Sequence, residues 1–124
     1  MSTEDERRVL LLLVDDEPEI RMLLRSMLGA RDWNVDEASS GPEALEKCGE
    51  DGYGAIILDQ RMPRMTGLEV ARELRGRGNE TPIVLFSAYL EPDVEAGAQE
   101  LGLPTVAKED FEELFDILER LVRA

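Results

Sequence analysis

Four short, uninterrupted apolar runs limit the folds that this chain can adopt. Each run has the length of a β-strand and is bounded by polar or turn-forming residues. Continuous rather than alternating hydrophobicity is typical of strands that are covered on both faces, as in a parallel sheet. The runs are VLLLLV at 9–14, AIIL at 55–58, PIVLF at 82–86 and LPTVA at 103–107, and a weaker alternating segment, NVDEA at 34–38, is suited to a sheet edge.

Segments with helical periodicity separate these predicted strands. After Pro18, a residue tolerated in the first turn of a helix, apolar residues recur at spacings of three and four up to Gly29. Ser40 is a candidate N-cap for a second helix, and three further patterns lie at 68–74, 92–102 and 111–122. Because strand and helix alternate five times, right-handed crossovers predict an α/β fold: an open, doubly wound parallel sheet with helices on both faces.

Length and charge set further limits. The 124 residues fit one domain, with a flexible N-terminal arm expected at 1–7 and the folded domain at 8–124. Fourteen basic and 28 acidic residues give a net charge of -14, which disfavours nucleic acid and favours cationic partners or a metal ion. No apolar stretch approaches the ~20 residues that span a bilayer, and the single cysteine fits a reducing compartment. We therefore expect a cytoplasmic protein without membrane insertion.

Polar residues stand at the carboxyl ends of four of the predicted strands. They are Asp15 and Asp16 after the first run, Asp59 after AIIL, Ser87 after PIVLF and Lys108 after LPTVA. In open parallel sheets, functional groups collect at this edge. A single acid or serine in such a place often caps a helix or forms a turn. Capping explains neither Lys108 nor Asp59, because Asp59 is followed by Gln-Arg-Met-Pro rather than by a helix.

The predicted cluster is short of positive charge. Two unit charges about 4 Å apart repel by roughly 4 kcal/mol at an effective dielectric of 20, so three carboxylates beside one lysine must hold a proton or bind a cation. Oxygen ligands, in a chain without histidine, select a hard cation such as Mg²⁺. A metal ion, an ammonium and a hydroxyl beside a carboxylate suit a phosphoryl group, with Asp59 as the in-line nucleophile. These residues predict the formation of an aspartyl phosphate.

The same residues resemble those of the receiver domain of two-component response regulators. The segments LLLVDDEPEIR, IILDQRMPRMTGLE, PIVLFSA and VAK carry the resemblance, which covers essentially the whole chain. It implies a flavodoxin-like fold with the strand order 2-1-3-4-5. It also implies transfer of a phosphoryl group to Asp59 from a sensor histidine kinase or a histidine phosphotransfer protein. A regulator of this kind catalyses its own phosphorylation and dephosphorylation, and no turnover of a separate substrate is expected.

The resemblance also implies roles for the residues around the acceptor. Asp16 and Asp59 would bind Mg²⁺ directly, Asp15 would act largely through water, and the backbone carbonyl of Arg61 would be a further ligand. Ser87 and Lys108 would hold the phosphoryl oxygens. In the loop after the acceptor, Gly67 would permit a close backbone turn.

Phosphorylation would switch the binding of a downstream protein through the face formed by the fourth helix, the fifth strand and the fifth helix. That face is acidic, with Glu112, Glu113, Asp116 and Glu119 available. Homodimer formation stays open, as does whether the chain is a whole protein or one domain of a longer regulator.

Three departures from the family pattern concern the switch. Thr105 stands where the family usually has an aromatic residue, so Tyr89 is a candidate for an alternative aromatic reporter. Glu109 follows Lys108 in place of a proline that is often cis, so this peptide bond is either trans with a changed loop or strained. Arg61 lies two residues after the acceptor and is predicted to alter dephosphorylation, by shielding water or by pairing with the phosphate.

Other functions remain open at this point. Thr105 and Glu109 would suit a receiver-like protein-binding module with degenerate switching. A phosphohydrolase of the haloacid dehalogenase type also forms an aspartyl phosphate, but that family has a second aspartate two residues after the acceptor, where this chain has Arg61. A flavin-binding flavodoxin is disfavoured because no hydroxyl- and glycine-rich phosphate loop follows the first strand.

Overall fold

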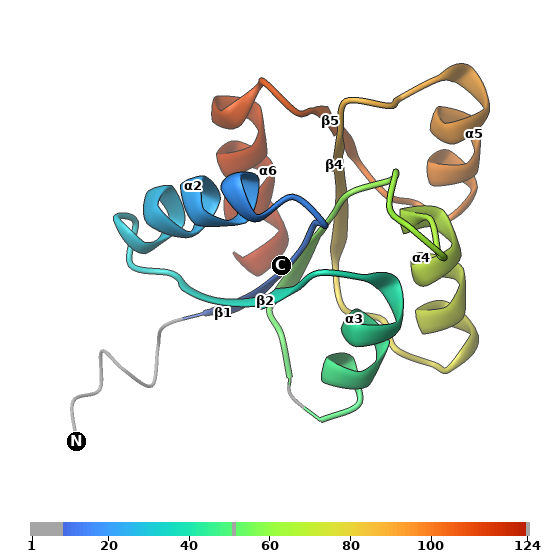
Figure 1. The fold of residues 1–124 in the computed structure, drawn as a ribbon, viewed down its shortest axis with the longest axis horizontal. Coiled ribbons are helices and arrows are strands. Elements are labelled where there is room, and N and C mark those ends of the chain that lie inside the picture. The colour runs from blue at the N-terminus through green and yellow to red at the C-terminus, as the bar shows by residue number, and fades with distance from the viewer. Residues whose placement is uncertain (1–8, 51, 124) are drawn as a thin grey trace.

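Strands and helices alternate along the computed structural model, which describes residues 9–50 and 52–123 (Figure 1). The predicted arm at 1–7 lies outside the described residues. The strands are β1 (Leu10–Val14), β2 (Asn34–Ala38), β3 (Ala55–Leu58), β4 (Ile83–Ser87) and β5 (Thr105–Ala107). The helices are α2 (Pro18–Gly29), α3 (Gly41–Cys48), α4 (Gly67–Gly76), α5 (Pro92–Glu100) and α6 (Phe111–Arg123).

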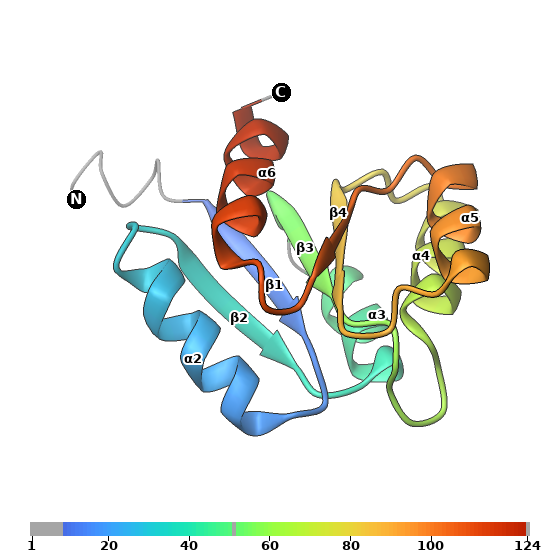
Figure 2. The ribbon, with the colours of Figure 1, turned by 90° about the horizontal axis from the view of Figure 1, so that it is seen from above.

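The five strands form one parallel sheet in the order β2-β1-β3-β4-β5. Helices α2 and α6 cover one face, and α3, α4 and α5 cover the other (Figures 1 and 2). The predicted doubly wound α/β fold and its strand order are therefore confirmed. Among the described residues, no helix is both long and apolar enough to span a bilayer.

Each face of the sheet has its own hydrophobic core. In β1, Leu11 and Leu13 pack in the core beneath α2 and α6, while Leu12 and Val14 pack in the core beneath α3, α4 and α5. All four side chains are at most 1% exposed. Full burial of a leucine or valine side chain contributes about 1.5–3 kcal/mol, so both sets stabilise the central strand. The continuous apolar runs follow from this two-sided burial.

Local sequence signals fix the starts of the helices near the functional edge of the sheet. Pro18 is the first residue of α2, where its missing N–H breaks no helical hydrogen bond. Ser40 caps α3, as predicted, by accepting a hydrogen bond from the N–H of Glu43 at 3.3 Å. Thr66 and Glu69 form a capping box at the start of α4. These caps set where each loop ends and its helix begins.

Candidate functional site

Asp15 and Asp59 emerge side by side from the middle of the sheet. They directly follow Val14 and Leu58, which are paired across β1 and β3. The N–H of Asp59 continues the ladder by donating to the carbonyl of Val14 at 3.0 Å. The two carboxylate side chains are only 3% and 4% exposed. The register of β1 and β3 thus brings two buried acids together at the carboxyl edge of the sheet.

Lys108 supplies positive charge from the adjoining part of the same edge. It follows β5, and its N–H donates to the carbonyl of Ser87 at 3.2 Å. Its Nζ lies 2.8 Å from Oδ2 of Asp15, 3.0 Å from Oε2 of Glu17 and 3.1 Å from Oδ2 of Asp59. Burial opposes the charge, but the hydrogen bonds to Asp15 and Glu17 and the charge of Asp59 outweigh it and raise the pKa of Lys108. The ammonium therefore stays protonated at neutral pH.

The two buried carboxylates are only partly compensated by this lysine. Burial raises the pKa of Asp15, although hydrogen bonds from Lys108 and from the N–H of Glu17 act in the opposite direction. Oδ1 of Asp59 is buried and has no hydrogen-bond partner among the described residues. A buried carboxylate oxygen without a partner is costly unless a proton or a cation compensates it. The site therefore has a free acceptor atom at the predicted phosphoacceptor.

Three carboxylates are placed where one cation could bind them. Asp15, Glu17 and Asp59 each offer an oxygen, and these oxygens lie within 4.8 Å of one another. All are hard donors, which fit Mg²⁺ better than zinc or copper. This group includes Glu17, whose side chain is 55% exposed, and does not include the half-buried Asp16. Asp16 remains a predicted ligand.

Glu17 was not among the predicted site residues. The available signal was the run of three acids at 15–17, directly before the proline that starts α2. Glu17 is the N-cap residue of α2, with an extended backbone and no side-chain capping hydrogen bond. Its carboxylate instead accepts from the ammonium of Lys108. The run alone does not tell whether Asp16 or Glu17 joins Asp15 at the lysine, because that depends on the path of the loop.

The loop after Asp59 packs tightly against the acceptor. A Cβ at Gly67 would fall against the carbonyl oxygen of Asp59 and lie 3.0 Å from its carbonyl carbon. The N–H of Gly67 donates to the carbonyl of Gln60 at 2.9 Å. Within the same loop, Arg64 has a positive φ of 71°. The close backbone approach predicted at Gly67 is thus present.

Arg61 and Tyr89 meet beside the site. The guanidinium carbon of Arg61 lies 4.4 Å from the centroid of the Tyr89 ring, in a cation–π contact. The N–H of Tyr89 donates to Oγ of the buried Ser87 at 3.1 Å. Arg61 and Tyr89 line a pocket of about 190 Å³ together with Gln60, Thr66, Glu91 and Val94. The contact joins the loop after the acceptor to the loop that follows Ser87, whose hydroxyl is predicted to bind the phosphoryl group.

The two other unusual positions also have defined surroundings. Oγ1 of Thr105 donates to Oε1 of Glu95 at 2.5 Å, which ties β5 to α5. No cis peptide bond occurs in the part of the chain that the structure describes, so the bond between Lys108 and Glu109 is trans. Of the two alternatives that Glu109 raised, the trans bond is the one observed.

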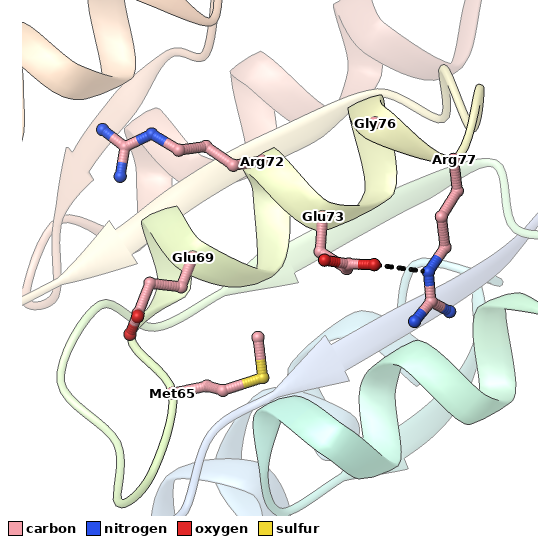
Figure 3. Close-up of a pocket in the computed structure, with 6 residues that line it drawn as sticks. All are labelled: Met65, Glu69, Arg72, Glu73, Gly76 and Arg77. Atoms are coloured by element: carbon pink, nitrogen blue, oxygen red, sulfur yellow. Dashed lines mark hydrogen bonds and ion pairs between the residues drawn. The ribbon is translucent and has the colours of Figure 1, made fainter.

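A larger open pocket lies along the exposed side of α4 and shares no residue with the acidic site. It has a volume of about 660 Å³ and is lined by Met65, Glu69, Arg72, Glu73, Gly76 and Arg77. Figure 3 shows these side chains, with Glu73 and Arg77 joined by an ion pair of 2.9 Å across one helical turn.

The protein is thus an α/β domain with a doubly wound parallel sheet and an acidic, lysine-bearing site at the carboxyl edge of that sheet. The sequence of residues 11–119 matches the response regulator receiver domain, and the chain belongs to that family. The response regulator MprA of Mycobacterium tuberculosis is 42% identical over 80 residues, which are 64% of this chain and 35% of MprA. The chain thus spans about a third of the length of this relative.

Solved structures give the same result over more of the chain. The response regulator TrrA of Thermotoga maritima, in complex with Mg²⁺ and BeF, is 35% identical with a TM-score of 0.82, over 91% of this chain and 98% of that one. A structure of TrrA with the histidine kinase ThkA gives 36% identity and the same TM-score of 0.82, over 91% of this chain and 97% of the matched one.

Proposed function

We propose that this domain accepts a phosphoryl group on Asp59 from a sensor histidine kinase or a histidine phosphotransfer protein, in a reaction that depends on Mg²⁺. Phosphorylation then switches the binding of a protein partner. One observation carries the proposal: the buried carboxylate of Asp59 has one oxygen on Lys108 and the other without a partner among the described residues.

The carboxylate of Asp59 is the nucleophile. One of its oxygens attacks the phosphorus of the phosphohistidine, an oxygen–phosphorus bond forms, and the phosphorus–nitrogen bond breaks with its electron pair left on the imidazole. Lys108, whose ammonium already contacts Asp59, neutralises a phosphoryl oxygen as charge develops. The hydroxyl of Ser87, at the end of the neighbouring strand, donates a hydrogen bond to another. The chain thereby catalyses its own modification without turning over a separate substrate.

The metal would be held by acids of the β1–α2 loop together with the acceptor. Candidates are Asp15, Asp16, Glu17, Asp59 and the carbonyl of Arg61. When bound, Mg²⁺ supplies charge neutralisation on the phosphoryl oxygens and orients the donor. The carboxylate oxygens that lie within 4.8 Å of one another support this assignment, as does the Mg²⁺ and BeF complex of the similar TrrA.

Partners follow from the charge of the domain and from its relatives. The complex of TrrA with ThkA supports a histidine kinase as the phosphoryl donor. The downstream partner would bind the face of α5, β5 and α6, where Glu112, Glu113 and Asp116 are exposed. A partner with a basic surface complements this face. A cytoplasmic location and the choice between monomer and homodimer stay predictions.

A second candidate function is favoured by Thr105. Its hydroxyl donates a hydrogen bond to Glu95. Threonine has no aromatic ring to bury when Ser87 moves, so the domain could bind a partner without switching. Nuclear magnetic resonance spectra with Mg²⁺ and beryllofluoride distinguish the two functions. The switch predicts shifted amides both at Asp59, Ser87 and Lys108 and on the face of α5, β5 and α6. Shifts confined to the acceptor site would favour the module without switching, and unchanged spectra would contradict the phosphoacceptor function.

A further inference from the structure

Arg21 links the loop that carries the acids to the edge of the sheet. Its Nη1 donates to the carbonyl oxygen of Asp15 at 2.6 Å, and its Nε donates to Oε1 of Glu37 at 3.0 Å. The side chain is only 17% exposed. A guanidinium is planar and presents its donors in a fixed fork, so two such contacts set the position of one acceptor relative to the other. Arg21 therefore joins the β1–α2 loop to β2.

The carbonyl that Arg21 holds belongs to the peptide group between Asp15 and Asp16. This peptide is at the start of the loop, and its orientation decides where the next two side chains leave the backbone. The N–H of Asp15 is fixed by the carbonyl of Ala38 at 3.1 Å, and its Oδ1 accepts from the N–H of Glu17 at 2.9 Å. Rotation of the held peptide would move the acids of the loop relative to the acceptor.

Glu37 is a firm anchor for this contact. It lies in β2, paired with Leu13 of β1, and its carbonyl accepts from Nζ of Lys47 at 2.5 Å. Hydrogen bonds from Arg25 and Arg21 outweigh the opposing effect of burial and lower the pKa of Glu37, so the carboxylate is ionised at neutral pH. Figure 2 shows α2, which carries both arginines, lying alongside β2.

Arg25 offers a comparison within the same cluster. Its Nη1 donates to Oε2 of Glu37 at 2.6 Å, and its side chain is 62% exposed. Among the described residues, no hydrogen bond joins it to the acidic loop. Arg25 and Arg21 thus share one glutamate, but only Arg21 reaches the peptide between the two aspartates.

We propose that Arg21 is a positioning residue for the cation site: it ties the peptide between Asp15 and Asp16 to Glu37 and so holds the acidic loop in the orientation that binds a divalent cation. The inference rests on the proposed Mg²⁺-dependent function. Arg21 does not contact the acceptor, and its effect is transmitted through the backbone of the loop. Residues that orient metal ligands from outside act in this way.

Titration with Mg²⁺, followed by nuclear magnetic resonance or calorimetry, tests the proposal with Arg21→Ala, Arg21→Lys and the matched control Arg25→Ala. Loss of such an orienting residue typically weakens metal binding by about 10–100-fold, and we expect Arg21→Ala to raise the Kd for Mg²⁺ by about tenfold. Arg21→Lys keeps the charge but not the fork and should give an intermediate Kd. Arg25→Ala removes an exposed ion pair and should change the Kd by less than about twofold.

Amide hydrogen exchange of the metal-free proteins separates this inference from the proposed function. The N–H of Glu17 should exchange faster in Arg21→Ala than in Arg25→Ala. If the parent does not bind Mg²⁺ but Glu17 still responds to Arg21, the metal-dependent function fails and the ordering of the loop by Arg21 holds. Equal Kd values in the two alanine variants would overturn the role of Arg21 at the cation site, and equal exchange would overturn its ordering of the loop. Should Arg21→Ala not fold, the same comparisons between Arg21→Lys and Arg25→Ala decide the matter.

Discussion

Replacement of Lys108 by methionine would leave two buried acids without the ammonium that now contacts both. Methionine keeps much of the length and apolar volume of the lysine stem, so the substitution removes mainly charge. Asp15 and Asp59 offer oxygens within 4.8 Å of each other. At an effective dielectric of 20, this separation corresponds to a repulsion of roughly 3.5 kcal/mol. Breaking a buried ion pair by removing one partner typically costs about 3–5 kcal/mol, and we expect a loss of about 3 kcal/mol in the free energy of unfolding near neutral pH.

The pH dependence of this loss has a definite sign. Burial raises the pKa of Asp15 in the parent, and removal of the lysine raises it further. A carboxyl group whose pKa is raised by folding favours the folded state when it is protonated. The deficit of Lys108→Met should therefore shrink as the pH falls through the raised pKa. Millimolar Mg²⁺ should also recover part of the lost stability, because it replaces the missing positive charge.

Urea unfolding of the parent and Lys108→Met, at neutral and acidic pH and with and without Mg²⁺, measures these effects. Arg77→Met is the control, since Nε of Arg77 binds Oε2 of Glu73 at 2.9 Å and the two side chains are 53% and 47% exposed. That exposed pair should contribute about 1 kcal/mol or less. A loss for Lys108→Met of no more than about 1 kcal/mol near neutral pH, or a deficit that does not change with pH, would refute the reasoning.

Three further substitutions test other parts of the site. Gly67→Ala places a Cβ against the carbonyl of Asp59 and should lower the free energy of unfolding by about 1–3 kcal/mol, whereas Gly76→Ala, with open space around its added Cβ, should not destabilise the protein in the same urea experiment. Arg61→Ala should shorten the lifetime of the phosphoryl group, measured by its rate of loss, because water gains access to it; a lifetime equal to that of the parent would count against this role. Glu37→Gln should make the stability fall less steeply in acid. Hydrogen bonds, foremost from Arg25, lower the pKa of Glu37 from its usual 4.5, so the parent loses this stabilisation as the pH falls through the lowered pKa. Equal slopes of stability against pH for both proteins would contradict the prediction.

The buried part of the site could be predicted because strand geometry determines it. Asp15, Asp59 and Lys108 each follow the last residue of a strand, and parallel pairing brings the carboxyl ends of β1, β3 and β5 to one edge. Apolar runs with strand length and caps such as Ser40 are local signals, and they located the elements to within one or two residues.

The contacts outside the sheet could not be predicted in the same way. Whether Asp16 or Glu17 turns toward Lys108 depends on the path of a three-residue loop, and Arg21 contributes to that path from the next helix. The stacking of Arg61 on Tyr89 joins two loops that no sequence periodicity relates. Long, flexible side chains have many rotamers, and only tertiary packing selects among them.

The identity of the phosphorylated residue tests the central claim most directly. The parent protein and Asp59→Asn are incubated with Mg²⁺ and acetyl phosphate, and the products are examined by intact-mass and peptide mass spectrometry. We expect the parent to gain a single phosphoryl group on the peptide that contains Asp59, and the variant and a parent sample with chelated metal to gain none. A parent that stays unmodified, or an Asp59→Asn variant that is labelled to the same extent, would contradict the assignment of Asp59 as the phosphoacceptor.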